Sequence, residues 1–147
     1  MLLVVVFAVL FYFFPLGLFD VEGGVAAIKL IGKDLPPENV QTDYAGVYRW
    51  TLMGAGLLGI VLALYTIFQF RERLYQVKLC RFNTLIHLVM LVVSFFYLDQ
   101  LKASLSHLDF TYGPAIFFPL ASLFLLLLSI RSIKKDEALV RAADRIR

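Results

Sequence analysis

Apolar residues along this chain gather in four long runs separated by polar segments. The runs cover residues 2–19, 47–70, 79–98 and 113–130. Their lengths fall near the roughly 17–25 mostly apolar residues that one membrane-spanning helix requires. We therefore predict an all-α membrane protein, a single domain in which four transmembrane helices form an antiparallel bundle.

Three polar segments connect the apolar runs. The longest, residues 20–46, contains Gly23 and Gly24 before an alternating stretch, and this pattern allows a short β-hairpin. Residues 71–78 form a short basic link between the second and third runs. Residues 99–112 form a second polar loop. We expect the first loop, the longer of the two, to lie outside the cytoplasm together with the second.

The distribution of Lys and Arg predicts the orientation of the bundle. Residues 71–81 carry four of the chain's 14 Lys and Arg, the tail at 131–147 carries six, and the opposite side holds the remaining four. Cytoplasmic loops of membrane proteins are enriched in these residues. We therefore place the link and the tail in the cytoplasm. An even number of spans then brings the N-terminus to the same side, as expected for a multi-pass protein of a bacterial inner membrane.

Composition narrows the range of functions. The chain is 61% hydrophobic and has a net charge of only +3, without the basic, aromatic-rich block that nucleic-acid binding favours. Its single cysteine, Cys80, excludes an intramolecular disulfide and a cysteine-only metal cage. The sequence has no phosphate-binding loop, dinucleotide fingerprint or nucleophile elbow. We predict a non-enzymatic protein with no catalytic residue, cofactor or metal.

The third run carries polar residues at helical spacing. Such a polar stripe faces other helices, because lipid cannot form hydrogen bonds with it. One interpretation is a proton relay or ligand site centred on His87. The other is hydrogen bonding between helices by a neutral histidine, which the absence of a carboxylate within any run favours. The stripe consists of Cys80, Asn83, Thr84, His87 and Ser94.

The second run contains small residues at every fourth position, Ala55, Gly59 and Ala63. Small residues at this spacing let another helix approach closely. The approaching helix belongs either to this bundle or to a partner subunit, including a second copy of the chain in a homo-oligomer. The pattern predicts close packing and leaves the identity of the neighbour open.

The tail at 131–147 predicts a helix that continues from the fourth run. Its charges of both signs are ordered at helical spacing and accompany a narrow apolar side. A docking helix for a partner is one interpretation, and the others are a helix lying on anionic lipid headgroups and a simple positive anchor. We favour docking, through Lys134, Lys135, Asp136, Glu137, Arg141, Asp144 and Arg145.

Outside the cytoplasm, Asp99, His107 and Asp109 supply oxygen and nitrogen atoms of the kinds that bind metals. Their spacing matches no recognised metal site, and exposed loops commonly carry such residues. We therefore predict no metal site there.

Residues 73–83 (RLYQVKLCRFN) and the tail (RSIKKDEALVRAADRIR) resemble an uncharacterised family of four-span membrane proteins from Bacteroidota. The steps Pro15-Leu16 and Pro119-Leu120 also fit, so the resemblance extends over the whole chain. It implies an inner-membrane protein of a Gram-negative cell and no catalytic residues. Members usually open with a short segment containing Gln and Arg, so we expect a natural start upstream of Met1.

Together these features predict a small accessory or scaffold subunit that associates with a larger membrane protein complex. The alternative is a small transporter or channel component that acts as an oligomer, with the polar stripe lining its path. The scarcity of ionisable residues inside the runs favours the first. Its partners would be the lipid bilayer and other membrane subunits, not nucleic acid.

Overall fold

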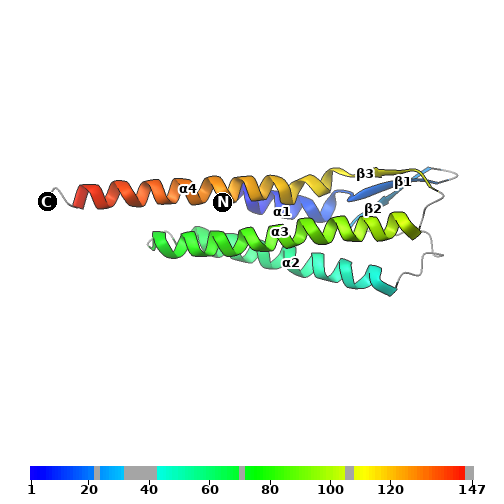
Figure 1. Ribbon diagram of the computed structural model, residues 1–147, viewed down its shortest axis with the longest axis horizontal. Coiled ribbons are helices and arrows are strands. Elements are labelled where there is room, and N and C mark those ends of the chain that lie inside the picture. The colour runs from blue at the N-terminus through cyan, green and yellow to red at the C-terminus, as the bar shows by residue number, and fades with distance from the viewer. Residues whose placement is uncertain (22–23, 32–42, 70–71, 105–107, 145–147) are drawn as a thin grey trace.

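The computed structural model describes residues 1–21, 24–31, 43–69, 72–104 and 108–144, and it is mostly helical (Figure 1). Its helices are α1 (Leu2–Phe13), α2 (Asp43–Phe68), α3 (Arg73–Ser104) and α4 (Phe117–Asp144), the last preceded by a short 3-10 helix, η1 (Pro114–Ile116). Its strands are β1 (Gly17–Val21), β2 (Gly24–Ile28) and β3 (Phe110–Tyr112). The predicted helical fold with a small hairpin is confirmed at this level.

The four helices lie side by side, and each runs opposite to the next along the chain (Figure 1). Helix α2 packs against α3, α3 packs against α4, and α1 contacts both α2 and α4. The sheet lies at one end of this arrangement, and the last turns of α4 project beyond the other helices at the opposite end (Figure 1).

Three helices in the described ranges are long and apolar enough to cross a membrane. They comprise Gly46–Phe68, Arg73–Ala103 and Pro114–Ala143. Helix α1 is apolar but has only 12 residues. At about 1.5 Å per residue it is roughly 18 Å long, shorter than the hydrocarbon core of a bilayer, which is about 30 Å thick.

The predicted first helix of residues 2–19 is wrong over its last six residues. Helix α1 ends at Phe13, and Phe14 has extended backbone angles, φ −85° and ψ 152°. Pro15 explains this end, because a proline disfavours helical geometry in the residue before it and has no N–H to donate. The apolar residues that follow lead into β1, and Leu16 and Phe19 among them are buried in the core beneath the sheet.

The three strands form an antiparallel sheet in the order β2-β1-β3. Strands β1 and β2 make the hairpin, with Gly17 opposite Ile28 and Val21 opposite Gly24. Strand β3, which the sequence analysis did not predict, pairs Phe110 with Phe19 across the other edge of β1. The sheet thereby joins the connection after α1 to the connection before α4.

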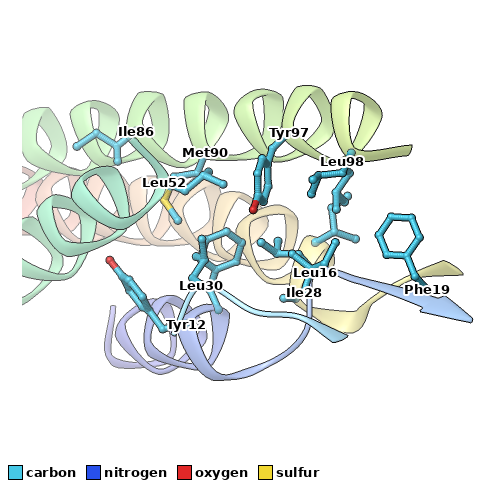
Figure 2. Packing of buried hydrophobic residues seen from close by; sticks show 14 residues of the cluster. Tyr12, Leu16, Phe19, Ile28, Leu30, Leu52, Ile86, Met90, Tyr97 and Leu98 are labelled. Carbon is cyan, nitrogen blue, oxygen red and sulfur yellow. The ribbon is translucent and has the colours of Figure 1, made fainter. Parts of the chain in front are cut away.

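The sheet is fixed to the helices by a cluster of buried apolar side chains (Figure 2). Leu98 and Tyr97 point from α3 toward Leu16, Ile28 and Leu30, and all five are buried. Burying a side chain such as leucine contributes about 1.5–3 kcal/mol relative to leaving it exposed. This cluster is therefore a main source of stability for the sheet end of the molecule.

Backbone hydrogen bonds hold the turn after α1. The amide of Leu16 donates to the carbonyl of Ile28 at 2.7 Å, and the amide of Gly113 donates to the carbonyl of Leu16 at 2.8 Å. The amide of Ala115 donates to the carbonyl of Pro15 at 3.1 Å. The end of α1 is thus bonded to both the hairpin and the beginning of α4.

Candidate functional site

The polar stripe of α3 faces the interior. Cys80, Asn83, His87 and Ser94 are fully buried, and Thr84 is partly buried. The four buried residues follow a spacing of three, four and seven, which places them on one side of the helix. The structure thus brings most of the predicted stripe together along the inner face of α3.

Gly59 of α2 lies directly against this face. A Cβ atom added at Gly59 would lie 3.2 Å from His87 Cε1 and 3.4 Å from the side-chain oxygen of Asn83. The absence of a side chain at Gly59 therefore lets α2 approach α3 at the two polar residues. Two groups of residues that the sequence analysis treated separately meet at this point.

The other small residues of α2 also pack within the chain. Ala63 is fully buried and forms a cluster with Val4 of α1 and Leu126 of α4. Ala55 is partly buried against the main apolar core. The ridge at Ala55, Gly59 and Ala63 is consequently used by the helices of this chain.

The hydrogen bonding of the His87 imidazole shows which ring nitrogen carries the proton. Its Nδ1 lies 3.0 Å from the backbone carbonyl oxygen of Asn83. Because a carbonyl oxygen only accepts hydrogen bonds, Nδ1 of the neutral ring must carry the proton, and Nε2 presents a lone pair. Nε2 has no hydrogen-bond partner within the described part of the chain.

Asn83 adds a donor and an acceptor to the same place. Neither Nδ2 nor Oδ1 of its amide has a hydrogen-bond partner among the described residues, although the side chain is fully buried. Together the amide and the Nε2 lone pair can bind a water molecule or another small polar group.

The two hydroxyls of the stripe bond to their own helix. The hydroxyl of Ser94 donates to the carbonyl of Met90 at 2.7 Å, and that of Thr84 donates to the carbonyl of Cys80 at 2.8 Å. The sulfur of Cys80 lies 4.0 Å from the sulfur of Met1. Hydroxyl bonds of this kind, to the carbonyl four residues earlier, satisfy a polar group without requiring a ligand.

Two buried hydroxyls escaped the sequence analysis. Ser122 of α4 is fully buried, and its oxygen has no partner within the described residues. Thr66 of α2 is also fully buried and donates to the carbonyl of Leu62 at 2.6 Å. Each is a polar residue inside an apolar run, and that signal alone predicts a side chain turned toward protein.

The tail forms the exposed end of α4. Two of its charged residues form an ion pair one helical turn apart, since Arg141 Nε lies 2.9 Å from Glu137 Oε1. Lys134, Glu137 and Arg141 line a groove of about 210 Å³ with apolar residues of α3, including Leu74. Lys135 and Asp136 are exposed. Arg145 and the side chain of Asp144, which were also predicted to dock, lie outside the described part of the structure.

The outer aspartates lie in the described ranges, whereas His107 does not. Asp99 and Asp109 line a hollow of about 580 Å³ together with Lys102. The described ranges contain no group of three or more His, Cys, Asp or Glu residues arranged to hold a metal ion.

Comparison with known proteins identifies a family but no characterised relative. Neither a curated protein nor a solved structure matches the chain. A family described as "Domain of unknown function (DUF4293)" matches residues 1–146. This agrees with the resemblance to an uncharacterised family noted from the sequence. Because the match covers nearly the whole sequence, the chain belongs to the DUF4293 family.

Proposed function

We propose that this protein is a non-enzymatic accessory subunit of a larger complex in a bacterial inner membrane. In this proposal α2, α3 and α4 span the bilayer, and α1 enters it from the cytoplasmic side without crossing it as a regular helix, so that both termini are cytoplasmic. The exposed end of α4 serves as the docking element. The proposal rests on the exposure of this end of α4.

The outer surfaces of the helices support the membrane placement. Large apolar side chains are exposed along the length of each long helix, in numbers that a soluble monomer rarely presents. A bilayer removes this surface from water without a protein partner. Examples are Leu58 and Val61 of α2, Leu85 and Phe96 of α3, and Phe124 of α4.

The end of α4 supports docking. Residues 131–144 continue the helix, and nearly all the side chains described there are exposed. Leu139 is 61% exposed and Val140 is 43% exposed, beside charged residues of both signs. A partner that covers Leu139 and Val140 would bury apolar area and stabilise the helix.

Affinity purification in mild detergent, followed by mass spectrometry, tests this function. Replacing Leu139 and Val140 together by serine should reduce recovery of a stoichiometric membrane partner by about 10-fold or more, because apolar anchors carry much of the energy of an interface. Ala142→Ser is the matched control, since it adds a hydroxyl to the same exposed helix without removing an anchor. Equal recovery from both variants would contradict docking through the tail.

The unpartnered polar groups of Asn83 and His87 favour a second candidate, a small transporter or channel component acting as an oligomer. Buried polar groups inside membrane helices often mark the path of an ion or proton. His87→Leu separates the candidates. A transport path through His87 loses flux in proteoliposomes, whereas an accessory subunit keeps its partner and changes only in stability.

A further inference from the structure

An open apolar groove lies between α1 and α2, on the half of the molecule near the sheet. It has a volume of about 480 Å³, within the range of roughly 300–1,000 Å³ that is typical of ligand sites. Val9 and Phe13 of α1 line one side, and Trp50, Met53, Gly54 and Leu57 of α2 line the other. The groove therefore runs about two turns along α2.

Two glycines of α2 have different roles at this groove. A Cβ added at Gly56 would meet the ring and hydroxyl of Tyr12, so Gly56 makes room for that side chain. A Cβ added at Gly54 would meet nothing within 4 Å. The hydroxyl of Tyr12, which also lines the groove, donates to the carbonyl of Met53. Its polar atom is thereby satisfied, and the groove remains apolar and open above Gly54.

A cation is fixed next to one end of the groove. Arg49, which is partly buried, donates from Nε and Nη2 to the carbonyl of Leu30, at 3.1 and 2.9 Å. Its neighbour Trp50 and the residue after Leu30, Ile31, both line the groove. Arg49 forms no ion pair with any residue in the described ranges. Since a guanidinium has five N–H donors, it can still bind an anion.

We propose that this groove binds a membrane phospholipid, with one acyl chain along α1 and α2 and the phosphate at Arg49. This inference rests on the membrane placement given under the proposed function. The groove is apolar and has a cation at one end, and a phospholipid has an apolar chain and an anionic head, so the two are complementary. Trp50, 71% exposed beside Arg49, is of the residue type that concentrates at the membrane–water boundary.

A helix from a partner subunit fits the groove less well. A helix with side chains is about 10–12 Å across, and it would use the arginine at the groove's end only if it placed an acidic group there. Arginine and phosphate form charge-assisted hydrogen bonds with matching geometry. The occupant is therefore assigned by the charge at Arg49 as well as by the shape of the groove.

Native mass spectrometry of the protein purified from its membrane in mild detergent tests this site. The wild-type protein should retain one phospholipid. Gly54→Leu fills the groove, and Arg49→Gln removes the charge, so each should lower the lipid-bound fraction by about 10-fold or more. Gly46→Leu is the matched control, because a Cβ at Gly46 also meets nothing within 4 Å and Gly46 does not line the groove. This control should retain the lipid.

Four results would overturn the site. Equal lipid retention in Gly54→Leu and Gly46→Leu would mean that the lipid binds elsewhere. A polypeptide lost only from Gly54→Leu would assign the groove to a partner helix. Release of the protein from membranes by alkaline carbonate would contradict both this site and the proposed function. A protein that stays in the membrane but retains no lipid would contradict the lipid site alone.

Discussion

Asn83 is a residue whose burial lowers the stability of the folded protein. Its amide is fully buried against Gly59, and neither polar atom has a hydrogen-bond partner among the described residues. Leaving a buried donor or acceptor unpaired costs about 1–3 kcal/mol. Ser94, equally buried on the same helix, avoids this cost by bonding to Met90. Asn83 therefore leaves a buried donor and acceptor that the described residues do not use.

Asn83→Leu should leave the stability of the protein unchanged or raise it by up to about 1–3 kcal/mol, because leucine has a similar branched shape and no polar atoms to satisfy. Thermal unfolding in detergent, followed by circular dichroism, measures the change. Ser94→Ala is the control and should lower stability by about 0.6 kcal/mol through loss of one hydrogen bond. A marked loss of stability in Asn83→Leu would mean that the amide is bonded in solution.

The residues of this site were predictable one helix at a time. Spacing along α3 identified Asn83 and His87 as inward-facing, and spacing along α2 identified Gly59. Their contact was not predictable, because spacing within one helix does not fix its rotation or height against another. Ser122 was missed although a polar residue inside an apolar run is itself a signal of a side chain turned toward protein.

At the scale of elements, the connection between Pro15 and Gly113 decides how α1 meets α4. A Cβ at Gly113 would overlap the backbone of Pro15 and Leu16. The φ angle of Gly113 is −82°, which any residue adopts, so glycine is required here for space. Because the neighbouring atoms are backbone atoms held by hydrogen bonds, they cannot rotate away.

Gly113→Ala should therefore destabilise the protein by at least about 1–3 kcal/mol, the usual cost of overpacking. Gly46→Ala is the opposite case, since its Cβ meets nothing and alanine favours a helix by up to about 1 kcal/mol over glycine. Melting temperatures of the two variants should move in opposite directions. A Gly113→Ala protein as stable as the wild type would show that the contact with Pro15 is absent in solution.

Helices and strands were predictable from the sequence where neighbouring residues alone determine them. The apolar runs that predicted the long helices are found in α2, α3 and α4, because helix length and hydrophobicity are read from neighbouring residues. The first run failed beyond Phe13 because Leu16 and Phe19 are apolar for burial in the sheet core. Strand β3 depends on pairing with residues roughly 90 positions earlier in the chain, which no local pattern contains.

At the scale of the whole molecule, the proposed orientation places the sheet outside the cytoplasm and the end of α4 inside. The structure offers a direct way to test it. Cys80 is the only cysteine in the sequence, and it is buried, so it gives little background in thiol labelling.

Asp109→Cys, near the sheet, should react with a membrane-impermeant maleimide in intact spheroplasts. Ala142→Cys, in the tail, should react only after the spheroplasts are lysed. Both positions are exposed, so accessibility in the protein itself does not limit labelling. The reverse pattern would invert the topology, and labelling of both positions in intact spheroplasts would mean that the helices between them do not separate two compartments.

The strand order β2-β1-β3 also has a consequence for synthesis. Strand β3 begins roughly 90 residues after β1 ends, which a ribosome needs about 4–18 s to translate. Throughout that interval the hairpin exists without its third strand, and the open edge of β1 remains available to other extended chains. The sheet end of the protein is therefore completed only after α2 and α3 have been made. Nascent chains halted before residue 110 should be the forms most readily recognised by quality-control proteases.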